Sequence, residues 1–353
     1  MKTTRPVSVM HVLSILALAA SGCSSAEPSD NALSDADALH HPCGGSPSAP
    51  TPAPSAPPPT TTDAGTPADA SAAADAAPAP TAPHLAPPFS PASSWNTPVP
   101  STATYTTLGW PAPTGYNYGV SWDGYSPAIY TGQSTDPLVQ VSIPNSWGWP
   151  AQTLAIRMPT GATGAAGTDG ELLAMDGTTV HNFWQFKRTS TTTATCSAYG
   201  RTDVVTGTGW GSKSPFLSAG IVAAGSSELA GLLVQAETDA GEIEHALAIA
   251  LDFGLQKPGA VGEAISSDGS SSTGIAQEGE RMAIPPSKPM PSGLSPLGQK
   301  VFRATQKYGV FSIDVAGGTS NFRAQANAYN ETVIIALQSD VAKIIPLLQQ
   351  VKF

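Results

Sequence analysis

The stretch from residue 241 to residue 253 carries an unbroken alternation that constrains the fold more than any other part of the chain. Read with a period of two, it places a largely apolar set on one face: Ile243, His245, Leu247, Ile249 and Leu251. The opposite face then holds acidic and small residues: Glu242, Glu244, Ala246, Ala248, Ala250 and Asp252. An Ala-rich helix is the alternative, because Ala, Leu and Glu all favour helix. The alternation favours a central strand with a histidine and carboxylates at its entry end.

The composition of residues 89–353 predicts a mostly β fold of the β-sandwich or jelly-roll kind. Gly, Ser and Thr are dense in this segment, and apolar residues at helical spacing are scarce before its C-terminal end. Asp176-Gly177 is a hairpin signal between two strand-like runs, 171–175 and 178–187. No second linker interrupts the segment, so we expect a single globular β-rich domain.

A few peripheral helices are expected around the sheets, and the clearest covers residues 295–309. Ser295 can cap this helix, Pro296 suits its first position, and Gly309 ends it. An apolar stretch at 341–351 predicts a further docking helix near the C-terminus, broken or started near its proline.

Residues 1–22 have the pattern of a signal peptide. Lys2 and Arg5 precede a short apolar run at 7–20, and small residues follow it. The run is too short to span a membrane comfortably. Because it ends in Ala-Ser-Gly before Cys23, the segment resembles the lipobox of bacterial lipoproteins. An ordinary secretory signal that is cut nearby is the alternative.

The lipobox resemblance implies a lipid anchor on Cys23. In bacterial lipoproteins the cysteine thiol is acylated, the peptide bond before it is cut, and its amino group receives a further acyl chain, such as palmitate. Acyl chains of this kind tie a protein to a membrane without spanning it. Ser24 stands where an acidic residue would favour retention at the inner membrane. The resemblance therefore implies a bacterial cell-envelope protein at the outer membrane or cell surface.

Residues 23–88 predict a disordered tether between the anchor and the domain. The segment is rich in Ala, Pro, Ser and Thr, and it contains no aromatic residue, no Lys and no Arg. Such a composition buries too little apolar surface to offset the entropy lost on ordering. A random coil of this length reaches about 45 Å.

The charge and the histidine content exclude several classes of function. Of the chain's 26 acidic residues, seven lie in the tether, and the rest leave residues 89–353 mildly acidic with no basic patch. Nucleic acid is therefore not an expected partner. The domain contains only two histidines, His181 and His245, and no metal-ligand spacing, so we expect no metal. The absence of a phosphate loop and of nucleotide motifs predicts no cofactor.

Two cysteines remain once Cys23 is assigned to lipidation. Cys43 lies in the tether and Cys196 in the domain. An extracytoplasmic compartment permits a disulfide between them, which would pin the tether to the domain, and a free pair is the alternative.

Aromatic residues are concentrated at the start of the domain: Trp95, Tyr105, Trp110, Tyr116, Tyr118, Trp122, Tyr125, Tyr130, Trp147 and Trp149. Sugar rings stack their C–H faces on such side chains, and neighbouring amides and carboxylates can bind the hydroxyl groups. The competing interpretation is that these rings fill a β core or pin long loops.

Short motifs occur in a fixed order along the domain: Gly167-Thr168-Asp169-Gly170, Asp176-Gly177, Phe183-Trp184-Gln185, Glu278-Gly279, Leu294-Ser295-Pro296 and Tyr308-Gly309. In this order they resemble a broad, functionally unassigned group of secreted bacterial proteins with a Gly-x-Ile-x-His-Ala-Leu signature. Here that signature runs from Gly241 to Leu247. Members of the group often have His where this chain has Glu171. The resemblance implies one domain and supplies no reaction.

The candidate catalytic residues come from three strand-like regions, 241–253, 178–187 and 193–205: Glu242, Glu244, His245, His181 and Arg201. His245 would act with a carboxylate from Glu242, Glu244 or Glu171, because histidines and paired carboxylates serve as acids and bases. The competing interpretation makes His245 a core histidine and the glutamates a solvated strand end. Asp176, Asp252 and Asp314 occupy strand-end or turn positions that need no function.

Two hypotheses for function follow from these features. The first is a lipid-anchored carbohydrate-active enzyme, a hydrolase or a lyase that acts on an extracellular polysaccharide, with Arg201 pairing a uronate. The second is a non-catalytic surface module that binds a glycan or a protein. Convergence of His181, His245 and a carboxylate in an aromatic-lined cleft would favour the first.

Overall fold

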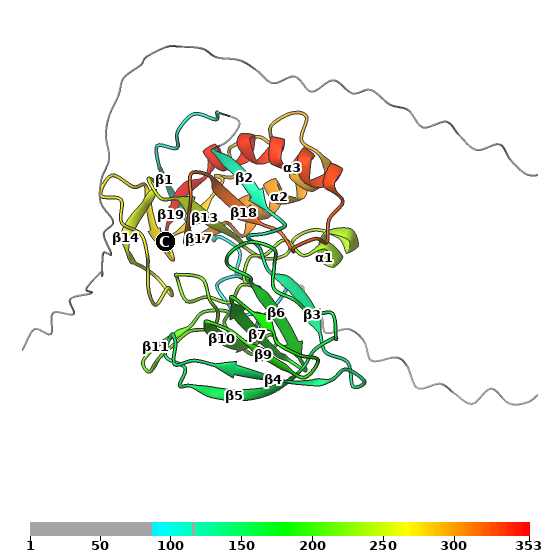
Figure 1. Cartoon of the computed structure of the whole chain (residues 1–353). Helices are drawn as coiled ribbons and strands as arrows, with labels where there is room; N and C mark the ends of the chain where they lie inside the picture. The colour runs from blue at the N-terminus through cyan, green and yellow to red at the C-terminus, as the bar shows by residue number, and fades with distance from the viewer. Residues whose placement is uncertain (1–86, 115–116) are drawn as a thin grey trace, which may run out of the picture. The chain divides into compact units, whose positions relative to one another are not determined.

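Most of the regular structure in the computed structural model is β-strand, as the composition predicts. The structure describes residues 87–114 and 117–353, which belong to one compact unit (Figure 1). The signal peptide at 1–22, Cys23, Cys43 and nearly all of the tether lie outside the described residues. A mostly β fold with few helices, one of them near the C-terminus, is confirmed.

The largest sheet has seven strands in the order β1-β19-β16-β17-β13-β18-β2. Their bounds are β1 (Thr104–Thr107), β19 (Gln349–Lys352), β16 (Arg281–Ala283), β17 (Val310–Ala316), β13 (Leu247–Asp252), β18 (Ser320–Arg323) and β2 (Tyr118–Ser121). The sheet is mixed, because β13 runs parallel to β17 and antiparallel to β18.

Strand β13 is a central strand of this sheet, and both of its faces are buried. Leu247, Ile249 and Leu251 pack in one apolar cluster with residues of helices α2 (Pro296–Lys307) and α3 (Glu331–Ile344). Ala246 and Ala248 pack in another, beside Trp95 and Phe311. The expected alternation of faces is therefore present, but the small-residue face meets a second layer of the core rather than solvent.

The sequence predicts that the central strand starts at residue 241, six residues before its observed start at Leu247. Residues 241–246 have no strand pairing, and β13 begins at Leu247. The Ala246 amide donates instead to the Trp95 carbonyl, 2.7 Å away, so a loop from the start of the domain takes the hydrogen bond that a neighbouring strand would need. The period-two assignment of Glu242, Glu244 and His245 to opposite faces is therefore wrong.

A four-stranded sheet in the order β10-β7-β6-β3 carries the predicted hairpin. Its strands are β3 (Ala128–Thr131), β6 (Leu172–Asp176), β7 (Thr179–Trp184) and β10 (Ala198–Asp203). Gly177 adopts a φ of 62° in the turn between β6 and β7, which are antiparallel, so the Asp-Gly signal is confirmed.

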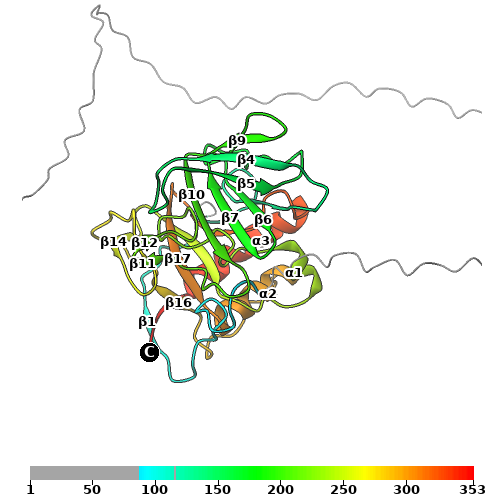
Figure 2. The same cartoon turned by 90° about the horizontal axis from the view of Figure 1, so that it is seen from below.

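A second four-stranded sheet, β5-β4-β9-β8, packs against this one. Its strands are β4 (Leu138–Ile143), β5 (Gln152–Arg157), β8 (Lys187–Arg188) and β9 (Thr193–Thr195). Both views place β4, β5 and β9 beside β6, β7 and β10 (Figure 1 and Figure 2). Two short ribbons complete the strands: β11 (Ser212–Lys213) with β12 (Phe216–Leu217), and β14 (Gln256–Ala260) with β15 (Ala276–Glu278).

One of the two predicted helices starts where its local signals place it, and the other does not. Helix α2 starts as predicted, because the Ser295 hydroxyl accepts from the Gly298 amide at 3.1 Å. A short helix, α1 (Gln235–Ala240), precedes the signature. The helix expected at 341–351 is corrected: α3 ends at Ile344, a 3₁₀ turn (Ile345–Leu347) follows, and the chain then enters β19.

Candidate functional site

His245, the first catalytic candidate, lies in the core rather than in a cleft. Its side chain is 1% exposed, and its Nε2 lies 3.0 Å from Glu237 Oε2. Its Nδ1 lies 2.8 Å from the carbonyl oxygen of Ala246. Burial disfavours the imidazolium, but the hydrogen bond and charge of Glu237 outweigh it and raise the pKa of His245. Both ring nitrogens are therefore used inside the protein, which is the behaviour of a structural histidine.

The two glutamates of the signature do not converge on this histidine. Glu242 is exposed and forms a bidentate pair with Arg303, with both N–O distances 2.8 Å. This hydrogen bonding lowers the pKa of Glu242. The Glu244 side chain is exposed, and its backbone amide donates to Glu237 Oε1 at 3.3 Å. Glu237 holds this loop in place instead, because its carboxylate contacts both the His245 ring and the Glu244 amide.

His181 and Arg201 lie opposite each other on β7 and β10. Neither of them is hydrogen-bonded to the Glu237–His245 pair among the described residues. His181 is buried, and its Nδ1 lies 2.7 Å from the hydroxyl of Tyr199. Burial is the main cause that lowers the pKa of His181 to about 4, and the Arg201 charge adds to it. The Arg201 guanidinium stacks over Trp149 at 4.9 Å. The two histidines therefore have separate hydrogen-bond partners, and the structure does not bring them together in one site.

A different pocket, of about 610 Å³, brings aromatic rings and carboxylates together. Three aromatic side chains line it: Trp147, Trp184 and Phe216. Trp147 comes from the loop after β4, Trp184 ends β7, and Phe216 begins β12. Phe216 is 45% exposed and the two tryptophans are half-buried, so their ring faces remain accessible.

Four acidic side chains line the same pocket: Asp169, Glu171, Asp268 and Asp314. Asp169 and Glu171 stand directly before β6, Asp268 lies in the loop between β14 and β15, and Asp314 lies on β17. These residues are far apart in the sequence, and the pocket forms where the sheet that contains β6 and β7 meets the C-terminal end of β17.

The turn that presents Asp169 is fixed by backbone hydrogen bonds. The Gln185 amide donates to the Asp169 carbonyl at 2.7 Å, and the Phe186 amide donates to the Gly170 carbonyl at 3.0 Å. Gly170 takes a φ of 47°, which favours glycine. The Asp169 carboxylate accepts a hydrogen bond from Trp184 Nε1 at 3.1 Å. This hydrogen bond and the turn thus fix the position of the Asp169 carboxylate relative to the Trp184 ring.

Asp314 is presented by an irregularity in β17. The pairing with β13 passes from Ile249–Ser312 to Ala250–Asp314, so Ile313 has no residue opposite it. Bulges of this kind redirect the side chains that follow them. Burial, with the charge of Asp268 as the next cause, raises the pKa of Asp314 to about 7. Asp314 is thus a carboxyl group that exchanges its proton near neutral pH, on the wall of a pocket.

Arg323 binds Glu171, one of the acids that line the pocket. Its Nη2 lies 2.7 Å from Glu171 Oε2 and also contacts the carboxylate of the buried Glu228. One guanidinium therefore faces two carboxylates in a site that excludes water. Burial raises the pKa of Glu171 and of Glu228 even though the Arg323 charge opposes the shift.

Sequence reasoning identified Glu171 as a possible acid and gave Asp314 no function. It missed Asp169 as a site residue, together with Asp268, Glu228 and Arg323. The signals available were Asp169 and Trp184 within shared motifs, and the polar residues at 320–323. Neither pattern shows that distant segments meet. Among the aromatic residues of 89–150, Trp95 is buried in the core, as the core-filling interpretation expects, and Trp147 lines the pocket.

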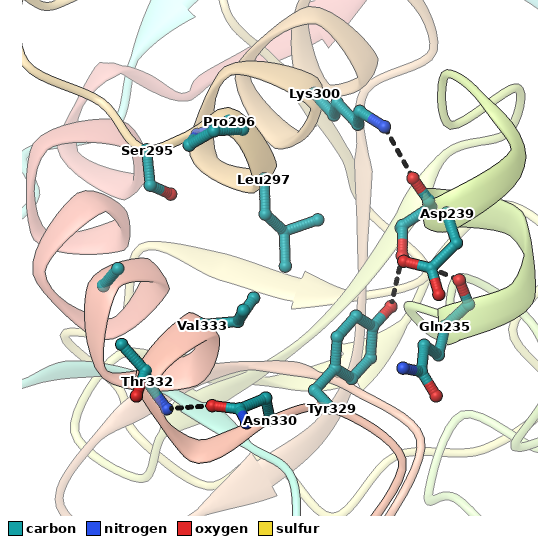
Figure 3. A pocket seen from close by; sticks show the side chains of 12 residues that line it. Gln235, Asp239, Ser295, Pro296, Leu297, Lys300, Tyr329, Asn330, Thr332 and Val333 are labelled. Carbon is teal, nitrogen blue, oxygen red and sulfur yellow. Dashed lines mark hydrogen bonds between the residues drawn. The ribbon is translucent and has the colours of Figure 1, made fainter.

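A second cavity, of about 400 Å³, lies between α1 and the starts of α2 and α3 (Figure 3). Its polar groups already bind one another: Lys300 Nζ donates to the Thr238 carbonyl, and the Thr238 hydroxyl lies 3.1 Å from that of Tyr329. Asp239 is the single carboxylate in its lining. This cavity lacks the paired acids of the Trp147 pocket and is the weaker candidate for catalysis.

Among residues 87–114 and 117–353, no group of His, Cys, Asp and Glu side chains is arranged to hold a metal ion. No helix within these ranges is long and apolar enough to cross a membrane. Cys196 is a buried free cysteine, and burial raises its pKa to about 12, so its thiol is unreactive.

Comparison with known protein families, with curated proteins and with solved structures finds no match for this chain. The geometry of the Trp147 pocket is therefore the basis for assigning a function.

Proposed function

We propose that the domain binds a polysaccharide in the pocket of Trp147, Trp184 and Phe216 and hydrolyses one of its glycosidic bonds. The observation that carries the proposal is the meeting of three aromatic side chains with four carboxyl groups in one pocket. Aromatic faces stack on the C–H faces of sugar rings, and glycosidases cleave with a pair of carboxyl groups. The volume of about 610 Å³ suits a ligand of one to a few sugar rings.

Asp314 is the general acid in this proposal. A carboxyl group with a pKa of about 7 keeps a substantial fraction of its protons at neutral pH, and a general acid works best when its pKa lies near the working pH. Asp314 donates its proton to the glycosidic oxygen as the bond from that oxygen to the anomeric carbon breaks.

Asp169 is the partner carboxylate. Its hydrogen bond from Trp184 orients it, and unlike Glu171 it has no guanidinium bound to it among the described residues. It stabilises the positive charge that develops on the sugar ring, and it takes a proton from the water that attacks the anomeric carbon. The water oxygen forms the new bond, so each event yields one new reducing end.

Hydrolysis fits the lining better than elimination does. A polysaccharide lyase removes a proton beside a uronate carboxylate and needs positive charge to bind that carboxylate. The residues that line the pocket include four acids and neither Lys nor Arg. Arg201, which was expected to pair a uronate, stacks over Trp149 and lines a different cavity.

The test is a panel of polysaccharides incubated with the full chain, with reducing ends and unsaturated uronates measured separately. We expect new reducing ends on at least one polysaccharide and no absorbance from unsaturated products. Unsaturated products would contradict the assignment of hydrolysis. Loss of viscosity with neither product would contradict glycosidic cleavage altogether.

A non-catalytic glycan-binding module is the second candidate. It is favoured by the exposure of Phe216, because an open aromatic face alone binds sugar. Trp184→Ala would then weaken binding to an insoluble polysaccharide while no reducing ends appear with the wild-type protein. Binding together with cleavage supports the enzyme, and binding without cleavage supports the module.

We also propose that a lipid on Cys23 anchors the protein in the bacterial cell envelope, at the outer membrane or the cell surface. The support is the lipobox-like end of the signal peptide, because Cys23 lies outside the described residues. Metabolic labelling with palmitate should mark the wild-type protein but not Cys23→Ser. Labelling of both proteins would contradict anchoring at Cys23.

A further inference from the structure

The Trp147 pocket has a strongly one-sided charge. Its lining supplies four carboxyl groups, and Arg323, which contacts one of them, is already bound to both Glu171 and Glu228. Lys and Arg are absent from the residues that line it. Asp169 and Asp268 are the two lining acids that neither contact a guanidinium among the described residues nor act as the protonated acid. An incoming anionic sugar would be repelled by these two charges, whereas a cationic sugar would be attracted to them.

A further acid lies behind the wall made by Asp268 and Asp314. Glu278 is fully buried, and its Oε1 accepts from the Asp268 backbone amide at 3.4 Å. Burial is the main cause that raises the pKa of Glu278 to about 10, and the hydrogen bond and charge of the Asp268 side chain, with the charge of Asp314, add to the rise. Glu278 therefore carries its own proton at neutral pH. The shift shows that Asp268 and Asp314 make this side of the pocket electrostatically negative.

The shape of the pocket shows where a cation would enter. Asp268 is exposed on its loop, and Asp314 is half-buried on β17, so the acids run from the surface inward. The aromatic side chains stand in the same lining. A sugar ring stacked on these aromatics can direct a substituent at the carboxyl groups. An ammonium group, with three N–H donors and a positive charge, satisfies acceptors of this kind.

We infer that the pocket selects polysaccharides whose sugars carry free ammonium groups, over neutral chains and over chains that contain uronates. This inference rests on the proposed function, because it takes the Trp147 pocket as the place where the sugar binds. It adds the charge of the substrate, which the hydrolysis proposal leaves open.

The test compares oligosaccharides of equal length that differ in charge. Oligomers of de-N-acetylated chitosan, N-acetylated chitin and oligogalacturonate would each be added to the full chain, at a pH where the amine is protonated. Quenching of the protein's tryptophan fluorescence would report the affinity for each oligomer. We expect chitosan to bind about tenfold more tightly than chitin, since one ion pair at a partly screened site contributes on this scale. The preference should shrink as salt is added.

Two acid-to-amide variants sharpen the comparison. Asp268→Asn removes an exposed pocket charge at little risk to folding, and it should reduce the ratio of chitosan to chitin affinity about fivefold. Glu244→Gln removes an equally exposed acid that does not line this pocket, and it should leave the ratio unchanged.

The outcomes distinguish failure of the cation preference from failure of sugar binding itself. Equal affinity for chitosan and chitin, or tighter binding of oligogalacturonate, would overturn the cation preference and leave sugar binding intact. A change of ratio in Glu244→Gln as large as that in Asp268→Asn would also overturn it, because net charge rather than the pocket would then be the cause. Failure of every oligosaccharide to bind would overturn the proposed function as well.

Discussion

Arg323 Nη2 lies 2.7 Å from Glu171 Oε2, and this ion pair joins two sheets of the domain. Arg323 ends β18 in the seven-stranded sheet, and Glu171 directly precedes β6 in the sheet that carries the hairpin. Glu228 completes the contact from the segment before α1. The pocket lies where these sheets meet. The position of Glu171 in its lining therefore depends on a buried guanidinium that two carboxylates share.

Arg323→Gln should therefore destabilise the domain strongly. It leaves two buried carboxylates without their cation, and breaking a buried pair in this way costs about 3–5 kcal/mol. Chemical denaturation of both proteins measures the difference in unfolding free energy. Arg303→Gln is the matched control, because its bidentate pair with Glu242 is solvent-exposed and should contribute less than about 1 kcal/mol. Equal losses would contradict the special role of Arg323.

His245 should matter for stability and not for catalysis. The pKa of His245 is raised in the folded state, so the protonated ring binds Glu237 more favourably than it does in the unfolded chain. This contribution is fully present below the unfolded pKa and is lost as the pH rises through the folded pKa. Denaturation at several pH values should show that the wild type exceeds His245→Gln in unfolding free energy at low pH. This difference should shrink as the pH rises. Catalysis abolished in a folded His245→Gln protein would contradict this role.

Asp268 should set the pH range of the reaction through Asp314. The negative charge of Asp268 is, after burial, the next cause of the raised pKa of Asp314. Because Asp314 must be protonated to act, activity should fall as the pH rises through about 7. In Asp268→Asn the pKa of Asp314 decreases, and the alkaline limb of the rate profile should move to lower pH. A profile that stays in place, or moves to higher pH, would rule out this coupling.

His181 should make the fold sensitive to acid. Its folded pKa of about 4 lies below the ordinary value, mainly because the ring is buried, so the unfolded chain binds the proton more tightly. Stability from this group is present at neutral pH and is lost between roughly pH 6.5 and pH 4. Unfolding free energies over this range should fall more steeply for the wild type than for His181→Gln. Parallel slopes would contradict the buried, neutral state of His181.

Local signals predicted the parts of the fold that local interactions determine. The Asp176-Gly177 turn needs a residue that tolerates positive φ, and Ser295 caps α2 through its own hydroxyl. The loop at 241–246 could not be predicted in the same way, because Trp95, about 150 residues earlier in the chain, takes the hydrogen bond of Ala246. Alternation of residue types continues into this loop without strand pairing.

The site was harder to predict than the fold for a related reason. Asp169, Asp268 and Asp314 come from separate segments, and no spacing within any one of them indicates that they meet. Glu244 and His245 are neighbours in sequence, but the Glu244 side chain is exposed whereas the His245 ring is buried. The folded chain uses that histidine to fix a loop through Glu237.

Asp314, as the proton donor, is the residue on which hydrolysis in the Trp147 pocket depends most directly. Release of reducing ends from the most responsive polysaccharide should fall at least about a hundredfold in Asp314→Asn, since a general acid contributes on this scale. Asp239→Asn, the same change in the second cavity, should retain wild-type activity. Wild-type activity in Asp314→Asn, with the fold intact, would contradict the assignment of this pocket as the catalytic site.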